Sequence, residues 1–180
     1  MAYDNLGESQ KAIADYNQAI VLNPNYAEAY SNRGWAYAQV GESQKAIADY
    51  NQAILLNPNY AKAYSNRGNA YVQLGQSQKA IADYNQAIVL NPNLAEAYNN
   101  RGLAYGLLGE YQKAIADFNQ AIILNPNLAL AYNNRGLAYA DLGESQKAIA
   151  DLQKAATLYQ QQGNTAKAQE ILDILRKVSQ

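Results

Sequence analysis

One spacing constrains this sequence more than any other feature: an Asn-Pro-Asn triplet returns every 34 residues, with prolines at positions 24, 58, 92 and 126. An Asn-Arg-Gly triplet keeps the same step, with arginines at positions 33, 67, 101 and 135. A fixed period of this length is typical of architectures in which small units stack on their neighbours. The chain is therefore expected to be a linear array of short, similar units.

Each period contains two helical patterns. In the copy that begins at Asn59, this residue is the expected N-cap, because its side-chain oxygen can accept from a free amide of the first turn. Helix A is predicted over residues 61–74 and ends at Gly75, a typical C-terminal glycine. Helix B is predicted over residues 77–90, since Pro92 disfavours helical geometry in the residue before it. The small and aromatic positions recur at helical spacing and include Tyr64, Gly68, Tyr71, Ala80, Tyr84 and Ala87.

These residues at these offsets resemble the tetratricopeptide repeat (TPR) over roughly residues 2 to 159. The resemblance implies an all-α chain, an α-solenoid of antiparallel helix pairs forming a right-handed superhelix. We assign residues 1–22 to a partial first repeat, mainly helix B, and residues 23–56, 57–90 and 91–124 to full repeats. Residues 125–162 form a repeat with an extended helix B, and residues 163–180 form a C-terminal capping helix.

The sequence departs from the usual TPR pattern at two positions together. Many TPR motifs have Leu where this chain has Arg, and Tyr where it has Asp. The double departure predicts a structural ladder of Arg–Asp bridges between helices A and B, and the alternative is a surface pair such as Lys45 with Asp49. The ladder comprises Arg33, Arg67, Arg101, Arg135, Asp49, Asp83, Asp117 and Asp151.

The resemblance also implies that the A helices line a concave groove that binds a protein or an extended peptide. A row of asparagines follows this wall, and a similar ladder holds peptides in the O-GlcNAc transferase family. The alternative is that these asparagines bridge neighbouring A helices and that Trp35 packs between them. The candidate groove residues are Asn32, Asn66, Asn100, Asn134, Trp35, Asn69, Leu103, Leu137, Asn99 and Asn133.

A second TPR binding mode, the carboxylate clamp of chaperone-binding domains, needs basic residues at set positions of the groove. Ser31, Leu130 and Asn134 stand at those positions, so we do not expect a clamp. We expect a near-neutral or mixed peptide instead.

Composition argues against several other functions. The chain has no His and no Cys, so most catalytic triads and zinc sites are excluded, and we expect no enzyme, cofactor or metal. A formal net charge of −1 gives no reason to expect nucleic acid or an anionic membrane as a partner. No secretory signal or membrane span is visible, and a cytoplasmic location is expected.

Two alternatives to a binding scaffold remain. Residues 9–22 carry an apolar face, and the chain could form an end-to-end homodimer through it. The close likeness of the copies also suits a designed or shortened repeat array that has no native ligand.

Overall fold

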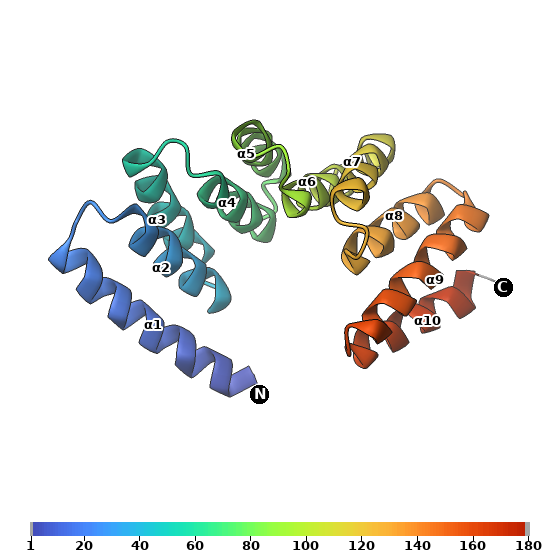
Figure 1. The fold of residues 1–180 in the computed structure, drawn as a ribbon, viewed down its shortest axis with the longest axis horizontal. Helices are drawn as coiled ribbons and strands as arrows, with labels where there is room; N and C mark the ends of the chain where they lie inside the picture. Colours follow the sequence, from blue (N-terminus) through green and yellow to red (C-terminus); the bar gives the residue numbers. More distant parts are fainter. Residues whose placement is uncertain (1, 179–180) are drawn as a thin grey trace. The chain divides into compact units, whose positions relative to one another are not determined.

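The computed structural model describes the backbone of residues 2–178 and the side chains of residues 7–176, so residues 1, 179 and 180 of the predicted end segments lie outside it. The described backbone is all-α and divides into two compact units, residues 1–92 and 93–180 (Figure 1). The first unit contains α1 (Ala2–Leu22), α2 (Ala27–Gln39), α3 (Ser43–Leu56), α4 (Ala61–Gln73) and α5 (Ser77–Leu90). The second contains α6 (Ala95–Leu107), α7 (Tyr111–Leu124), α8 (Ala129–Asp141), α9 (Ser145–Gln161) and α10 (Thr165–Val178).

Two turns alternate along the chain. The turn from helix A to helix B needs a left-handed residue, and Gly75 supplies it with φ of +70°. The next amide, of Gln76, donates to the carbonyl of Tyr71 at 2.9 Å, which ties the turn to the helix before it. The glycines at the equivalent positions of the other full repeats, 41, 109 and 143, also have positive φ.

The turn from helix B to helix A differs from our prediction. Asn59 does not cap α4, whose N-cap is Tyr60 without a side-chain hydrogen bond. Instead the Asn59 amide donates to the Oδ1 atom of Asn57 at 3.1 Å, and Tyr60 donates to the Asn57 carbonyl at 3.1 Å. The first asparagine of Asn-Pro-Asn therefore organises the turn, because Asn side chains readily bond the backbone two residues on.

Helix A and helix B meet at a contact between a glycine and a large side chain. A Cβ atom on Gly68 would lie 2.7 Å from Cε1 of Tyr84. The same contact recurs between Gly102 and Phe118 at 2.7 Å. A glycine inside a helix costs about 1 kcal/mol relative to alanine. The close approach of the two helices explains why that cost is repeated in each repeat.

The first helix also differs from the prediction. We assigned residues 1–22 to a partial first repeat that is mainly helix B, but α1 is one continuous helix from Ala2 to Leu22. Gly7 has the sequence register of the turn glycine Gly41, yet it is not among the glycines with positive φ. The turn elsewhere is held by a preceding helix A, and no such helix packs on α1 within the described residues.

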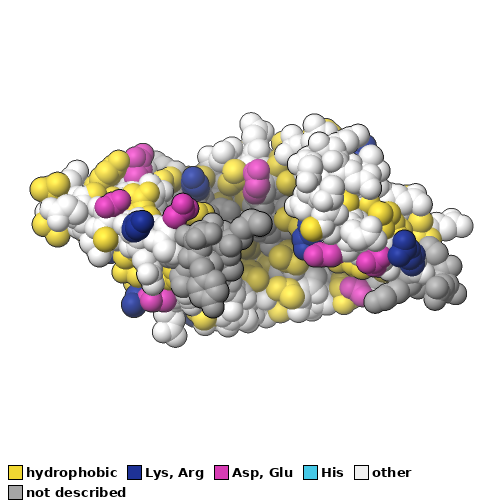
Figure 2. Space-filling view, turned by 90° about the horizontal axis from the view of Figure 1, so that it is seen from below, with side chains coloured by type: hydrophobic (Ala, Val, Ile, Leu, Met, Phe, Trp, Pro, Cys, Tyr) yellow, Lys and Arg dark blue, Asp and Glu magenta, His cyan; other side chains and the backbone are white. Residues whose placement is uncertain are grey.

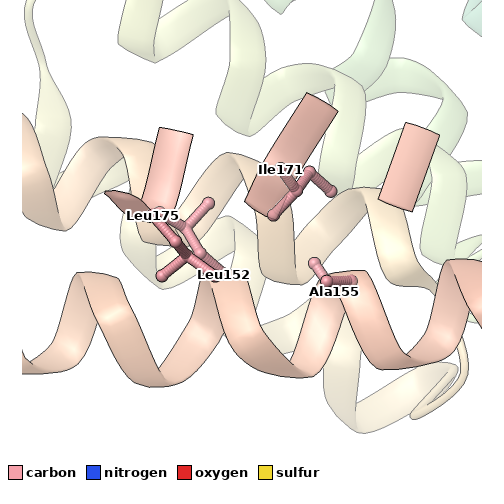
Figure 3. Close-up of a cluster of buried hydrophobic side chains, with 5 residues drawn as sticks. Leu152, Ala155, Ile171 and Leu175 are labelled. Atoms are coloured by element: carbon pink, nitrogen blue, oxygen red, sulfur yellow. The ribbon is translucent and has the colours of Figure 1, made fainter. Parts of the chain in front are cut away.

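The second unit ends in an apolar helix pair. The α9 helix spans 17 residues, whereas α3, α5 and α7 span 14 each. Its added length gives α10 a surface to pack on, where Leu152 and Ala155 of α9 meet Ile171 and Leu175 of α10 (Figure 3). The α10 helix therefore shields the face of α9 that would otherwise contact water.

Candidate functional site

An Arg–Asp pair joins helix A to helix B in each full repeat. In the repeat of α4 and α5, Nε and Nη2 of Arg67 donate to Oδ2 and Oδ1 of Asp83 at 2.7 and 2.6 Å. Bidentate pairs of the same geometry join Arg33 to Asp49, Arg101 to Asp117 and Arg135 to Asp151. The hydrogen bond to the carboxylate raises the pKa of each arginine.

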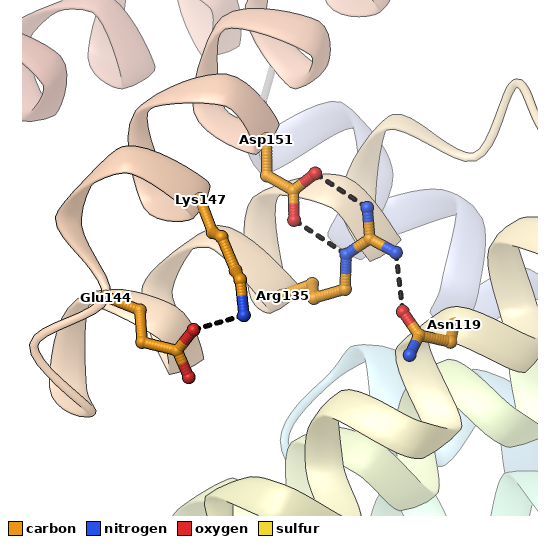
Figure 4. Close-up of polar contacts among 5 residues, drawn as sticks. All are labelled: Asn119, Arg135, Glu144, Lys147 and Asp151. Atoms are coloured by element: carbon orange, nitrogen blue, oxygen red, sulfur yellow. Dashed lines mark hydrogen bonds and ion pairs between the residues drawn. The ribbon is translucent and has the colours of Figure 1, made fainter.

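The surface alternative for these aspartates does not occur. Lys45, which we considered as the partner of Asp49, instead contacts Glu42 at 2.5 Å on the exposed start of α3. The same exposed pair joins Lys147 to Glu144, beside the more enclosed pair of Arg135 with Asp151 (Figure 4). The two kinds of ion pair are thus separate, one at the helix start and one between helices.

Sequence reasoning missed a third partner of these arginines. Nη1 of Arg67 donates to Oδ1 of Asn51 at 2.6 Å, and Asn51 belongs to helix B of the repeat before. In the same way, Nη1 of Arg33 donates to Oδ1 of Asn17 at 2.7 Å, and Nη1 of Arg135 donates to Oδ1 of Asn119 at 2.5 Å. Each of these arginines therefore links three consecutive helices. The signal was present, because each of these asparagines follows an aspartate by two residues inside a helix, where asparagine is a mediocre helix former.

In the second unit, the predicted Asn ladder bonds mainly to itself. Nδ2 of Asn134 on α8 donates to Oδ1 of Asn99 on α6 at 3.1 Å, and this bond is buried. Nδ2 of Asn99 donates in turn to Oδ1 of Asn100 at 3.0 Å, and Nδ2 of Asn133 donates to Oδ1 of Asn134 at 3.3 Å. The bond from Asn134 to Asn99 bridges two neighbouring A helices, which is the structural alternative that the sequence left open.

The first unit presents its asparagines differently. Asn32 on α2 and Asn66 on α4 are half-buried, and neither side chain forms a hydrogen bond with another residue in the part of the chain that the structure describes. Their neighbours Ser31 and Ser65 are buried and stand where the second unit has Asn99 and Asn133. Ser31 is too short to reach Asn66 as Asn99 reaches Asn134, so the amide of Asn66 keeps its donors and acceptor.

Asn69, another predicted groove residue, has a structural partner. Its Oδ1 atom accepts a hydrogen bond of 2.7 Å from the hydroxyl of Tyr84, which is buried in the contact between helices A and B. In the next repeat, Leu103 and Phe118 occupy the same two positions. The hydroxyl and its acceptor are therefore both absent from that repeat.

Apolar side chains of the predicted groove are exposed. Trp35 on α2 is 52% exposed, Leu103 on α6 is 40% exposed and Leu137 on α8 is 38% exposed. Trp35 therefore keeps about half of its surface accessible to a ligand. Within the second unit, Leu103 and Leu137 line one pocket together with Asn134.

Charged side chains are few on the face shown in Figure 2, where hydrophobic and uncharged polar side chains predominate. Among the described residues no group of His, Cys, Asp or Glu side chains could hold a metal ion. No helix in the described part of the chain is long and apolar enough to cross a bilayer.

Comparison with solved structures supports the fold. The chain is similar to MamA, with 30% identity over 87% of this chain and 92% of that one, and a TM-score of 0.77. It is similar in fold to TTC0263, a thermophilic TPR protein of Thermus thermophilus, with 24% identity, coverage of 93% and 92%, and a TM-score of 0.78. It is also similar to the first TPR of Spaghetti (RPAP3) bound to the HSP90 peptide SRMEEVD, with 28% identity, coverage of 65% and 93%, and a TM-score of 0.63.

Family models lead to the same result. None of the curated proteins matches this chain. The tetratricopeptide repeat model matches residues 27–60, 95–128 and 129–161, and two related models of the same repeat match residues 2–41, 68–109 and 49–82. These matches cover most of the helices described above and follow the same 34-residue step. The chain belongs to the tetratricopeptide repeat family.

Proposed function

We propose that this chain is a non-catalytic scaffold that binds an extended peptide along the exposed face of its A helices. The observation that carries the proposal is the hydrogen bonding of the Asn32 and Asn66 side chains. Each sits at the same position of an A helix in the first unit, is half-buried, and makes no side-chain hydrogen bond within the described residues. Asparagine in a helix interior is unfavourable, and a structural partner does not explain it at these two positions.

The chemistry of an amide suits a peptide backbone. Asn side chains offer two donors and one acceptor, so each can pair with both the N–H and the C=O of an extended chain. Such pairing is independent of the peptide's side chains, and recognition of sequence must then come from neighbours such as Trp35. An exposed tryptophan can serve as an anchor, because aromatic residues often carry much of the binding energy of an interface.

The relatives support peptide binding but not the same ligand. The TPR of Spaghetti is bound to an HSP90 peptide, SRMEEVD. The present chain has Ser31, Leu130 and Asn134 where the resemblance requires basic residues to clamp a terminal carboxylate. We therefore propose a near-neutral or mixed peptide as the partner and not an acidic tail.

A peptide array tests the proposal. The whole chain is screened against extended peptides, and the affinity of the best binders is measured for the wild type, for Asn66→Ala and for Asn32→Ala. Each substitution removes a bidentate contact and should weaken binding about tenfold, which is about 1.4 kcal/mol. Gln44→Ala on the exposed side of α3 is the control. Peptides that bind all four proteins equally well would contradict a role for the asparagines.

One observation favours a second function, self-association through residues 9–22. Ala12 and Tyr16 on α1 are partly exposed, whereas Ala46 and Tyr50, their counterparts on α3, are 0% and 1% exposed. A second copy could cover this face of α1. Tyr16→Glu should then lower the molecular mass measured by sedimentation equilibrium, and a wild type that stays monomeric at every concentration would exclude this function.

A further inference from the structure

An apolar pocket opens on the second unit between α6, the start of α7 and α8. Its volume is about 210 Å³. For comparison, an apolar cavity of about 150 Å³ holds a benzene molecule. The pocket is lined chiefly by carbon, and the residues that define it are Leu103, Gly106, Leu107, Tyr111, Phe118 and Leu137.

The pocket exists because one repeat departs from the others. Gly106 stands where the neighbouring repeats have Ala38, Val72 and Ala140. A Cβ atom built on Gly106 would meet no other atom within 4 Å, so the missing side chain leaves open space. This glycine does not serve a close helix contact or a left-handed turn, unlike Gly102 and Gly109, and its structural cost needs another explanation.

At the matching positions of the first unit, polar groups join the two helices. There the hydroxyl of Ser43 donates to Oε1 of Gln73 at 2.8 Å, which joins the start of α3 to the end of α4. The second unit has Tyr111 and Asp141 at those two positions. Tyr111 packs instead against the cluster around Phe118 and forms one side of the pocket. The hydrogen bond between the two helices is thus replaced by an apolar wall.

Three leucines around the pocket are exposed. Leu103 and Leu137 are 40% and 38% exposed, and Leu107, which replaces a glutamine of the first unit, is 59% exposed. Each leucine left in water forgoes part of the stabilisation that burial would give it. A cluster of exposed apolar side chains around an unfilled pocket is the usual form of a binding site for an apolar group.

The charge at the rim of the pocket indicates which residue of a ligand would lie next to the bound apolar group. Asp141 is the only charged residue that lines the pocket, and no described residue forms an ion pair with it. A cationic side chain next to the apolar one would pair with this carboxylate. Asp141 also disfavours an acidic neighbour through like-charge repulsion.

We propose that this pocket takes one large aliphatic or aromatic side chain of a bound peptide, with a Lys or Arg next to it that pairs with Asp141. The inference rests on the proposed peptide-binding function and adds the identity of an anchor. The pocket is formed by α6, α7 and α8 of the second unit. The peptide is therefore selected by an apolar–basic pair of adjacent residues.

The test uses a displayed library of random peptides selected on the whole chain. The best binder is then measured against the wild type, Gly106→Leu, Leu107→Gln and Asp141→Asn. Gly106→Leu fills the pocket from a position with open space, so the fold should keep or raise its melting temperature while the affinity falls tenfold or more, by about the effect of one unburied apolar side chain. Asp141→Asn should weaken binding up to about fivefold, because an exposed ion pair contributes little. Gln112→Leu, on the exposed side of α7, is the matched control.

The outcomes separate this inference from the function on which it rests. Selected peptides that share an apolar–basic pair, and that lose affinity for Gly106→Leu but not for Gln112→Leu, would support the pocket. Peptides that bind the A helices without such a pair, or that bind Gly106→Leu as well as the wild type, would overturn the pocket and leave the scaffold function standing. A selection that yields no binding peptide would overturn both.

Discussion

Replacing Arg67 by leucine tests the energetic role of the Arg–Asp ladder. Arg67 and Asp83 form two hydrogen bonds of 2.7 and 2.6 Å, and their side chains are only 17% and 8% exposed. Arg67→Leu removes one partner and leaves the carboxylate of Asp83 enclosed without a counter-charge. Breaking a buried pair in this way costs about 3–5 kcal/mol of the free energy of unfolding. Asn51 also loses its donor, but Asn51 is exposed and water can replace that bond.

The double variant Arg67→Leu/Asp83→Tyr tests whether the bridge adds net stability or only fixes how the two helices approach each other. It restores the Leu and Tyr that many TPR motifs carry at these positions. Replacing both members of a buried pair by well-packed apolar groups is often neutral or stabilising by about 1–4 kcal/mol. We therefore expect each single substitution to destabilise the protein and the double variant to recover to the wild-type level or above it. The coupling free energy between the two positions should be about 3 kcal/mol or more.

Urea denaturation followed by circular dichroism measures all four proteins of this cycle. Repeat arrays can lose two-state behaviour, so the transition should be checked by a second probe such as tyrosine fluorescence. Lys45→Ala, which removes the exposed pair with Glu42, is the control and should leave the midpoint unchanged. A single Arg67→Leu variant as stable as the wild type, or a double variant as unstable as the two singles combined, would refute the reasoning.

Three further results are expected. Gly68→Ala should lower the free energy of unfolding by about 1–3 kcal/mol, because its Cβ atom would lie 2.7 Å from the ring of Tyr84 and overpack the contact. Gly106→Ala should raise the free energy of unfolding by about 0.5–1 kcal/mol, because its Cβ atom would meet open space. Equal unfolding midpoints of the two variants in urea would contradict the packing argument. Burial, and then the nearby aspartates, raise the pKa of Tyr50 and Tyr84 above the ordinary 10.0, so the stability they contribute is complete below about pH 10 and is lost as pH rises beyond it. The melting temperature should therefore fall above that pH, less steeply in Tyr50→Phe, and a flat profile would contradict it. Ile171→Ala should lower the free energy of unfolding by about 2–5 kcal/mol, since Ile171 is 3% exposed. A melting temperature equal to that of the wild type would show that α10 does not cap the unit.

Most of the fold followed from the sequence because each local signal agreed with the period. Predicted helix B of residues 77–90 is α5, and predicted helix A of residues 61–74 exceeds α4 by one residue. The turn glycine Gly75 has the left-handed conformation expected of it. The predicted N-cap at Asn59 was wrong because the side chain of Asn57 organises the turn before the helix instead, by accepting a hydrogen bond from the Asn59 amide. Both asparagines of the triplet are good turn or cap residues, so the sequence does not distinguish which of them bonds the backbone.

The site was harder to predict because the roles of its asparagines depend on neighbours in other helices. Asn66 and Asn134 occupy the same position of their helices, yet Asn134 bonds to Asn99 and Asn66 makes no such bond among the described residues. The difference follows from Ser31, which the first unit has where the second has Asn99. A motif that is identical in every copy therefore leads to two different chemical environments.

Comparison of the copies separates structural residues from candidates for recognition. The Arg–Asp pair that joins helix A to helix B is constant and has the same geometry in each full repeat. Several positions that vary face outward from the A helices, where the first unit has an exposed Trp35 and the second has leucines around a pocket with Asp141 at its rim. A selection on folding alone would not distinguish these outward positions, because substitutions there change stability little. Their clustered variation over a constant framework is therefore better explained by a partner whose successive residues differ than by the needs of the fold.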